Sequence, residues 1–388
     1  MNVLYLDWPC YGQEHVLKSL RRDFHFDVDL FFHENYSDRF SEAFDRAFDE
    51  KVEQKAYDFV FSFNFYPLVA EGCKRHNLKY LALVYDSPQV KLYSYKISYP
   101  TNYVFLFDSV EYRRLRDGGL PTVYYSVLPA SADALNDCLR KPIDRRRVTA
   151  DISFVGSLYN EEHNFYDRIY DRLPDFAKGY LDAVINAQKL VQGYNFLEEV
   201  LYPNILEALQ AVEPYAPYPD GVETLQYVYA SYYLGRKLAA IERTEYLTRL
   251  GENYKVRLFT QDAKQRIPGV ENMGPCDYIK ELPLVFHFSR INLNFTYRSI
   301  QSGIPLRCME ILGAGGFLLS NYQADLCEFF VPGEDFVYFE DTEDLVKKAG
   351  YYLEHEDERK AIALRGSEKA LAEHNYKTCL SKMFEVAL

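Results

Sequence analysis

The chain has 388 residues, a hydrophobic content of 48% and a formal net charge of −13. Because single hydrophobic cores rarely serve more than about 300 residues, this length predicts two domains, each with its own core. The acidic balance argues against a surface for nucleic acid or anionic membrane, since such surfaces need clustered Lys and Arg. The basic run Arg145 to Arg147 is expected to be an exposed linker.

Cysteine usage and apolar-run length indicate a cellular location. The seven cysteines include no C-x-x-C pair, which favours reduced thiols and argues against a zinc site. The first residues, MNVLYLDWPC, lack a basic region followed by a long apolar run, and no stretch of about 18 apolar residues occurs. We therefore expect a soluble, cytoplasmic protein without membrane insertion.

The first part of the chain alternates short apolar runs with helical patterns. The apolar runs are NVLYLD, FDVDLFF, YDFVFSFN, KYLALVYD, NYVFLFD and TVYYSVL, and helical spacing occurs near 13–23, 38–56, 67–76 and 109–117. Strands that alternate with helices predict a parallel sheet covered on both faces. We expect a Rossmann-like domain over residues 1–140, with ligands beyond the carboxyl ends of its strands.

A second alternation begins with the strand ADISFVGS at 150–157 and resumes with KVRLFTQD at 255–262. Between them, at about 160–250, lies an insertion rich in Tyr, Leu and Glu, which PYAPYPDG at 214–221 interrupts. We expect about four helices in this insertion. Residues 148–370 are assigned to a second Rossmann-like domain that carries it.

The stretch 290–321, RINLNFTYRSIQSGIPLRCMEILGAGGFLLSN, carries the most specific chemical signal. INLNF predicts a buried strand, and IPLRCMEILGAGG has helical spacing with Pro305 near its first turn. The helix dipole disfavours a cation in the first turn, so Arg307 there indicates a bound anion such as a diphosphate. The alternative is a local ion pair between Arg307 and Glu310, worth about 0.2–0.5 kcal/mol.

The same stretch resembles the donor-binding signature of glycosyltransferases of the GT-B class. It is most similar to the bacterial group related to the CgeB spore maturation protein, in which a GIP-x-R-x-x-[DE] run precedes two small residues and a strand. The resemblance extends over most of the chain. It implies an α/β, GT-B-like fold of two doubly wound Rossmann-like domains facing a cleft, with a last helix, 371–388, that crosses back to the first domain.

The resemblance also implies an activity. We expect a metal-independent enzyme that moves a sugar from a nucleotide-sugar to an acceptor, which is a protein, a glycan or a small molecule. The donor is expected to be a nucleoside diphosphate sugar, with UDP favoured, and no cofactor is expected. Asp341–Asp344 (DTED) is expected to cap a helix and not to bind a metal ion.

Two other functions and two roles of the insertion stay open at this point. The first function is that of a sugar-nucleotide epimerase or hydrolase on the same fold. The second is that of a catalytically silent sugar-nucleotide-binding or scaffold protein of spore or envelope assembly. The insertion at about 160–250 can serve packing, dimerisation or acceptor recognition, so an oligomer is not excluded.

In the second domain the resemblance implies a donor site at the carboxyl ends of the strands. Arg307 and the amides near Gly303 and Ile304 would hold the diphosphate, while Glu310 would accept hydrogen bonds from ribose hydroxyls. Base recognition is expected from the loops Thr260–Asp262 and Met273–Pro275. The full expected donor set is Gly156, Ser157, Asn294, Tyr297, Arg298, Ser302, Gly303, Ile304, Arg307 and Glu310.

The sequence departs from the family pattern at Ser302 and in the segment that follows Ser157. Ser302 stands where related enzymes carry a second glutamate that touches the sugar. Gly156 and Ser157 would let a diphosphate approach the backbone, but the basic residue that the family commonly places a few positions later is missing, because Glu161, Glu162 and His163 follow. Arg298 is the expected substitute for that missing phosphate partner.

In the first domain the expected base is Asp86, in YDSP at the end of the fourth strand. Glycosyl transfer needs a base that takes the proton of the acceptor hydroxyl, and His15 is the second candidate for that role. Gly12, Gln13 and Glu14 follow the first strand and are expected on the acceptor side. Each has an ordinary alternative, because Asp before Ser-Pro starts turns and polar residues before a helix cap it.

Overall fold

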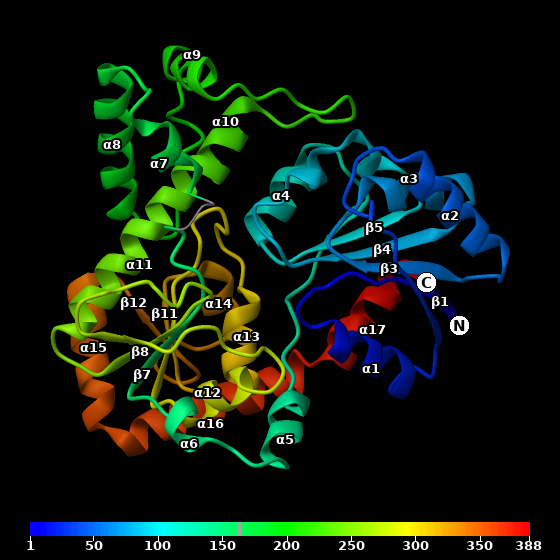
Figure 1. The fold of residues 1–388 in the computed structure, drawn as a ribbon. Coiled ribbons are helices and arrows are strands. Elements are labelled where there is room, and N and C mark those ends of the chain that lie inside the picture. Colours follow the sequence, from blue (N-terminus) through cyan, green and yellow to red (C-terminus); the bar gives the residue numbers. More distant parts are fainter. Residues whose placement is uncertain (161–163) are drawn as a thin grey trace. The chain divides into compact units, whose positions relative to one another are not determined.

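The computed structural model describes residues 1–160 and 164–388. The chain divides into two compact units, and each contains one six-stranded sheet in which neighbouring strands are parallel. The predicted α/β class with two parallel, helix-covered sheets is confirmed (Figure 1). Unit 1 comprises Met1–Leu128, Ala216–Thr224 and Asn375–Leu388, and unit 2 comprises Pro129–Tyr215 and Leu225–His374.

The sheet of unit 1 has the strand order β2-β1-β3-β4-β5-β6. Every residue of β3 is buried, as expected for a strand covered on both faces. Strand β2 lies on one side of β1 and all later strands lie on the other, so the sheet has its topological switch point between β1 and β3. The strands are β1 (Asn2–Leu6), β2 (Asp27–Phe31), β3 (Phe59–Phe63), β4 (Lys79–Val84), β5 (Asn102–Leu106) and β6 (Val123–Tyr125).

The last helix of the chain packs against the first helix inside unit 1. Phe384 of the last helix meets Phe24 edge-on at 4.9 Å, and Tyr376 lies 5.3 Å from the ring of His15. The first helix starts after Gly12, which has φ 82° and whose added Cβ would lie 2.8 Å from the Tyr376 hydroxyl, so this position requires glycine. The helices of unit 1 are α1 (Gln13–Arg22), α2 (Glu42–Glu53), α3 (Pro67–Arg75), η1 (Val90–Tyr93), η2 (Tyr95–Ser98), α4 (Ser109–Asp117) and α17 (Tyr376–Ala387).

Residues 216–224 belong to unit 1, although the sequence pattern assigned them with the insertion to the second domain. Asp220 accepts a 2.5 Å hydrogen bond from Ser94 and lies 3.5 Å from the guanidinium of Arg39, and Glu223 lies 3.6 Å from the same guanidinium. All three charged side chains are buried. Buried carboxylates need a buried cation, and unit 1 supplies it, so the expected boundary is corrected here.

The sheet of unit 2 has the order β12-β11-β10-β7-β8-β9. Strands β8 and β9 lie on one side of β7 and the later strands lie on the other, so the switch point is between β7 and β10. Ile152, Leu258, Leu293 and Leu319 of the central strands are buried in one hydrophobic core. The strands are β7 (Ile152–Val155), β8 (Val256–Phe259), β9 (Val270–Asn272), β10 (Ile291–Asn294), β11 (Leu318–Asn321) and β12 (Val337–Phe339).

The insertion is helical, as predicted, and forms the upper left part of unit 2 in Figure 1. Three of its helices gather there, and a continuous helical run with a central π-helical turn leads from them to the sheet. Those three helices are α7 (Phe165–Tyr170), α8 (Asp175–Lys189) and α9 (Pro203–Val212). The run consists of α10 (Leu225–Val228), η3 (Tyr229–Leu234) and α11 (Gly235–Gly251).

The remaining helices of unit 2 flank its sheet or connect its strands. Asp341 caps one of them, because its side chain accepts a 2.8 Å hydrogen bond from the backbone N–H of Asp344, which confirms the predicted cap. These helices are α5 (Asp133–Leu139), α6 (Arg145–Val148), α12 (Leu282–Phe288), α13 (Leu306–Gly313), α14 (Ala324–Phe329), α15 (Thr342–Glu354) and α16 (Glu356–Glu373).

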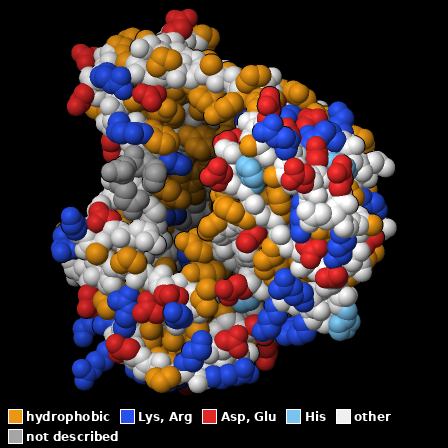
Figure 2. Space-filling view, turned by 45° about the vertical axis from the view of Figure 1, so that its right-hand side comes forward, with side chains coloured by type: hydrophobic (Ala, Val, Ile, Leu, Met, Phe, Trp, Pro, Cys, Tyr) orange, Lys and Arg blue, Asp and Glu red, His pale blue; other side chains and the backbone are white. Residues whose placement is uncertain are grey.

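The surface charges and the free cysteines fit the expectations from the amino-acid composition. Figure 2 shows acidic and basic side chains intermixed on the face that it draws. The seven cysteines are free thiols. Within the described residues, every helix is too short or too polar to cross a bilayer.

Candidate functional site

The carboxyl ends of β7 and β10 form the switch point of the unit 2 sheet, and Arg243 of α11 joins them. Its Nη1 donates to the Ser157 carbonyl at 2.5 Å, and its Nη2 donates to the Phe295 carbonyl at 2.7 Å. The guanidinium also lies 4.6 Å from the centre of the Tyr159 ring. Sequence reasoning missed Arg243, because it lies 86 residues from Ser157 in a helix without a recognisable motif.

Helix α13 presents Arg307 and Glu310 at its first turns. Their side chains form an ion pair, with 2.8 Å between Nη1 and Oε2, and the Arg307 guanidinium lies 5.3 Å from the centre of the Phe286 ring. The local pair considered from the sequence therefore exists. The Arg307 side chain is 26% exposed, so it stays accessible to a ligand while it is paired.

The carboxyl group of Glu310 is only half used by this pair. Its Oε1 atom is buried and has no hydrogen-bond partner in the described structure. Burial raises the pKa of Glu310, against the opposing effects of the Arg307 charge and the Tyr278 hydroxyl. A buried oxygen without a donor is costly, and a ligand hydroxyl would relieve that cost.

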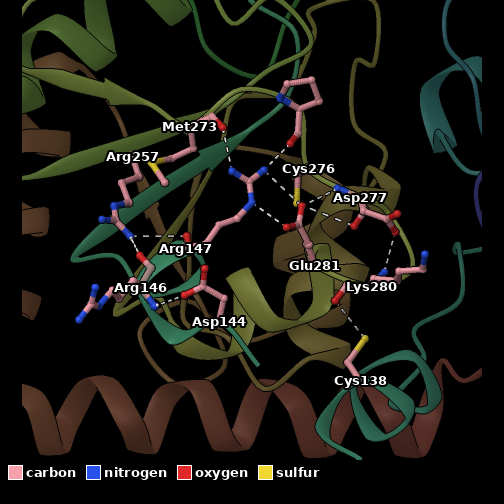
Figure 3. Close-up of polar contacts among 11 residues, drawn as sticks. Cys138, Asp144, Arg146, Arg147, Arg257, Met273, Cys276, Asp277, Lys280 and Glu281 are labelled. Atoms are coloured by element: carbon pink, nitrogen blue, oxygen red, sulfur yellow. Dashed lines mark hydrogen bonds and ion pairs between the residues drawn. The ribbon is translucent and has the colours of Figure 1, made fainter. Parts of the chain in front are cut away.

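A loop held by Arg147 lies beside these residues. Arg147 donates to the carbonyls of Met273 and Pro275 at 3.0 and 2.6 Å, and its Nε lies 2.6 Å from the Glu281 carboxylate. Figure 3 shows its guanidinium between Met273 and Glu281. The expected exposed linker is thus correct for Arg146 but wrong for Arg147, because loop acceptors converge on that side chain.

The two loops expected to recognise the nucleotide base lie side by side. The Thr260 amide donates to the Gly274 carbonyl at 3.2 Å. Burial raises the pKa of Cys276 to about 12, while the charges of Arg307 and Arg147 oppose this rise. The second loop therefore lies within electrostatic reach of Arg307.

Asn294 and Tyr297 of the expected donor set belong to the buried framework of unit 2. Asn294 donates to the hydroxyls of Thr296 and Ser320, both at 2.9 Å. The hydroxyl of Tyr297, which is also buried, donates to the Ser231 carbonyl. These polar groups are used to fix the end of β10 and the loop that follows it.

Arg298 has a buried partner of its own. Its guanidinium lies 2.5 Å from the Glu242 carboxylate, with side-chain exposures of 7% and 6%, and it donates to Gln192 at 2.8 Å. A cation already neutralised in the interior is a poor phosphate ligand. The expectation that Arg298 replaces the missing basic residue is therefore not supported by its contacts.

The loop before α13 is fixed by the connection that follows β11. Gln323 donates to the Gly303 carbonyl at 3.0 Å, and the Asp325 amide donates to the Ser302 carbonyl at 3.0 Å. Ser302, Gly303 and Ile304 are buried. Gly156 and Ser157 follow β7, as predicted, whereas the neighbouring Glu161, Glu162 and His163 lie outside the described residues.

In unit 1 the carboxyl ends of β3 and β4 are joined by Asn64. Its Nδ2 donates to the Asp86 carboxylate at 2.7 Å, while its Oδ1 accepts the backbone N–H groups of Tyr85 and Asp86, both at 3.2 Å. Asn64 has φ 60°, a left-handed conformation that is costly outside glycine and clusters at functional sites. Burial raises the pKa of Asp86, against the Asn64 hydrogen bond and the Lys91 charge.

A cluster of aromatic side chains includes Tyr85, the residue before Asp86, and sequence reasoning missed it. Trp8, which follows β1, donates to the Phe63 carbonyl at 3.2 Å and stacks with Tyr36 at 5.9 Å and Tyr85 at 6.5 Å. The only sequence signal was that Trp8 is the single tryptophan. These rings lie at the switch point of the unit 1 sheet, where ligands of doubly wound sheets bind.

The polar residues after β1 are mostly held by local contacts. Gln13 donates to Asp7 at 2.6 Å and accepts from the Cys10 thiol at 3.5 Å. The ring of His15 packs against Tyr376, whereas Glu14 is exposed. Their acceptor-side role stays a prediction.

No cluster of three or more His, Cys, Asp or Glu suited to a metal ion occurs in residues 1–160 and 164–388. The unit 2 site instead contains guanidinium groups and backbone amides. Such groups stabilise phosphate charge without a metal ion.

Comparison with known proteins adds a family and a fold. Residues 239–385 match the family model described as glycosyl transferase-like, and this segment includes Arg307 and Glu310. A search among curated proteins found no match. Solved structures do match over nearly the whole chain.

HepE, a sucrose-phosphate synthase and an alpha-glucosyltransferase are among these structures, each with a TM-score just above 0.5. HepE from Anabaena, in complex with UDP and glucose, has 10% identity and a TM-score of 0.52, with 100% of this chain and 99% of that chain covered. Sucrose-phosphate synthase from Thermosynechococcus elongatus has 11% identity and a TM-score of 0.51, with 99% and 98% covered. An alpha-glucosyltransferase in complex with UDP-glucose and DNA has 10% identity and a TM-score of 0.52, with 100% and 98% covered.

At such low identity these structures establish the shared fold, and the family model adds the matching sequence. The match covers α13, the helix that carries Arg307 and Glu310. Residues 239–385 are therefore similar to a glycosyl transferase-like family, and the whole chain shares the two-sheet fold of these GT-B glycosyltransferase structures.

Proposed function

We propose that this protein transfers a sugar from a UDP-sugar to an acceptor hydroxyl without a bound metal ion, as a member of the CgeB-like group. The donor class is supported by the solved neighbours, since HepE and the alpha-glucosyltransferase are described in complex with UDP or UDP-glucose. The group is supported by the run GIPLRCME, which ends at Glu310.

The observation that carries the proposal is the arrangement of Arg307 and Glu310 on α13. Arg307 lies in the first turn, where free amide groups and the helix dipole attract an anion. Glu310 lies one turn further with its Oε1 unused. A nucleoside diphosphate offers both complements, a diphosphate for the cation and the amides, and ribose hydroxyls for the carboxylate.

The reaction follows from these roles. The acceptor oxygen attacks the anomeric carbon, the bond between that carbon and the diphosphate oxygen breaks, and Asp86 takes the acceptor proton if the transfer inverts configuration. The raised pKa of Asp86 makes it a stronger base than an ordinary aspartate. Arg307 and the α13 amides stabilise the negative charge that develops on the leaving UDP.

Calorimetry with UDP, GDP, CDP and ADP tests the proposal. We expect UDP to bind most tightly, and Arg307→Ala to weaken that binding by about 1.5–3 kcal/mol, the usual size for a charge-assisted hydrogen bond. Arg146→Ala is the control, because Arg146 is exposed and contacts the linker. Absence of binding by all four nucleotides would refute the proposal, and binding without sugar transfer to any acceptor would favour the silent sugar-nucleotide-binding protein.

A further inference from the structure

Arg243 is a buried cation without a carboxylate partner. Arg243 is only 9% exposed, and among the described residues no ion pair joins its guanidinium to an acidic group. Its Nη1 and Nη2 donate to backbone carbonyls, while its Nε is buried and has no hydrogen-bond partner. An arginine keeps its charge in proteins. Glu242, which acts on this charge electrostatically, is already paired with Arg298, so the charge of Arg243 is only partly compensated.

The contrast with Arg298 shows how unusual this is within the same unit. Arg298 and Arg243 are both buried, but Arg298 pairs with Glu242 at 2.5 Å. Interior charges are normally paired, because the loss of hydration costs several kcal/mol when no opposite charge compensates. Arg243 therefore stands where an anion from outside the chain would lower the free energy of the folded protein.

The position of Arg243 indicates where that anion binds. The carbonyls that it holds belong to Ser157 and Phe295, which follow β7 and β10, the two strands of the switch point. In doubly wound sheets, ligands bind beyond the carboxyl ends of the strands at this point. Gly156, which precedes Ser157, lies close to the same guanidinium, since a Cβ added there would be 3.7 Å from Nη1.

Arg307 lies within electrostatic reach of Arg243. Burial lowers the pKa of Arg243, electrostatic interactions with Tyr159 and Glu242 oppose this, and the positive charge of Arg307 adds to the lowering. Two guanidinium groups near one another repel, and Glu310 balances part of the charge of Arg307, so a bound anion would offset the remaining repulsion. The N-terminus of α13, which carries Arg307, supplies amide groups for the same anion.

We propose that Arg243 supplies the second positive charge that attracts the donor diphosphate, from beneath the turn Gly156–Ser157. It replaces the basic residue that is absent from the sequence after Ser157. Because its Nε is sealed from solvent, Arg243 acts mainly through its charge and by orienting the turn, while Arg307 makes the direct contact. This inference rests on the proposed function, since it assumes a nucleoside diphosphate in unit 2.

A purely structural role is the competing explanation. Arg243 could serve only to join the ends of β7 and β10, as its two carbonyl contacts would allow. A structural loss would weaken every ligand of the site alike. A lost charge would weaken the ligands in proportion to their phosphate charge.

The experiment compares UDP with uridine in calorimetry, for the wild-type chain and for Arg243→Met and Arg243→Lys. We expect Arg243→Met to weaken UDP roughly 10- to 100-fold and uridine by much less, as loss of a charged interaction implies. Arg243→Lys should restore most of the UDP affinity, because it keeps the charge. If Arg243→Met fails to fold, Arg243→Lys alone tests the role of the charge. We expect its ratio of UDP to uridine affinity to stay near that of the wild type, and a clearly lower ratio would contradict the inference.

Arg257→Met is the matched control. Arg257 also donates to backbone carbonyls, those of Arg146 and Thr149, but near the start of β8 and so at the opposite edge of the same sheet. It should leave the ratio of UDP to uridine affinity unchanged. Equal weakening of UDP and uridine by Arg243→Met, or no weakening of either, would overturn the inference alone, whereas a wild-type chain that binds no nucleoside diphosphate would overturn the proposed function as well.

Discussion

The side-chain amide of Asn64 donates a 2.7 Å hydrogen bond to the carboxylate of Asp86 and so ties the end of β3 to the end of β4. Asn64 does this from a left-handed backbone conformation with φ 60°. Its carbonyl oxygen is used as well, by the amides of Tyr85 and Asp86. The position and the ionisation of the expected base therefore depend on one strained residue.

Replacing Asn64 should change the ionisation of Asp86. The Asn64 hydrogen bond lowers the pKa of Asp86, so Asn64→Gly, which tolerates the same φ, should raise that pKa further. Carbon-13 NMR of the Asp86 carboxyl group measures the change directly and needs no acceptor. Asn64→Ala should raise the pKa similarly but be about 1 kcal/mol less stable than Asn64→Gly, because alanine is strained at positive φ. An unchanged pKa in both variants would contradict the role assigned to Asn64.

Replacing Glu310 should reduce the preference for UDP over an analogue that lacks the ribose hydroxyls. If the free Oε1 accepts a ribose hydroxyl, wild-type protein should bind UDP more tightly than 2′,3′-dideoxy-UDP by roughly tenfold, as expected for a hydrogen bond to a charged group. Glu310→Gln should narrow this difference severalfold, because a neutral amide is a weaker acceptor. Calorimetry of both ligands checks it, and an equal preference in wild type and variant would exclude Glu310 as the ribose partner.

Loosening the loop held by Arg147 should weaken the binding of the nucleotide base more than the binding of its phosphates. Arg147→Met removes the hydrogen bonds to Met273 and Pro275 and the contact with Glu281. We expect uridine and UDP to weaken by similar factors, roughly 3- to 10-fold, since the loss of one to two ordinary hydrogen bonds is at stake. Arg146→Met is the control. Weakening restricted to UDP would indicate a phosphate role for Arg147 instead.

The stability of the protein should depend on Lys91 at alkaline pH. Burial, followed by the charge of Arg39, lowers the pKa of Lys91 to about 8 from its usual 10.5. The folded protein thus releases this proton more easily than the unfolded chain. Below pH 8 the buried charge of Lys91 lowers the free energy of unfolding by its whole amount, and this loss disappears as pH rises to 10.5.

Lys91→Met should therefore stabilise the protein at pH 7 and lose that advantage towards pH 10.5. Urea unfolding of both proteins at several pH values measures the difference. Lys55→Met is the control, because Asp27 raises the pKa of Lys55. A constant difference between wild type and Lys91→Met over this pH range would show that Lys91 acts through packing alone.

Much of the fold was predictable because its signals are local. Short apolar runs that alternate with helical spacing predicted two parallel sheets, and the helices at α13 and α17 lie within the predicted stretches. The first turn of α13 was predictable for the same reason, since three-residue spacing on a helix brings Arg307 and Glu310 together without help from the rest of the chain. For this reason the sequence also allowed for their ion pair.

Other features required the tertiary structure, because they depend on partners far apart in the chain. Residues 216–224 join unit 1 because Asp220 meets Arg39 there. No feature of the local sequence distinguishes Arg298, which forms an ion pair with a buried carboxylate, from Arg243, which does not. The sequence by itself determined the alternation of strands and helices and the pair on α13, through short-range spacing. Which cations keep charge available for a ligand was decided only by long-range packing, since a charge is neutralised by whatever the fold places beside it.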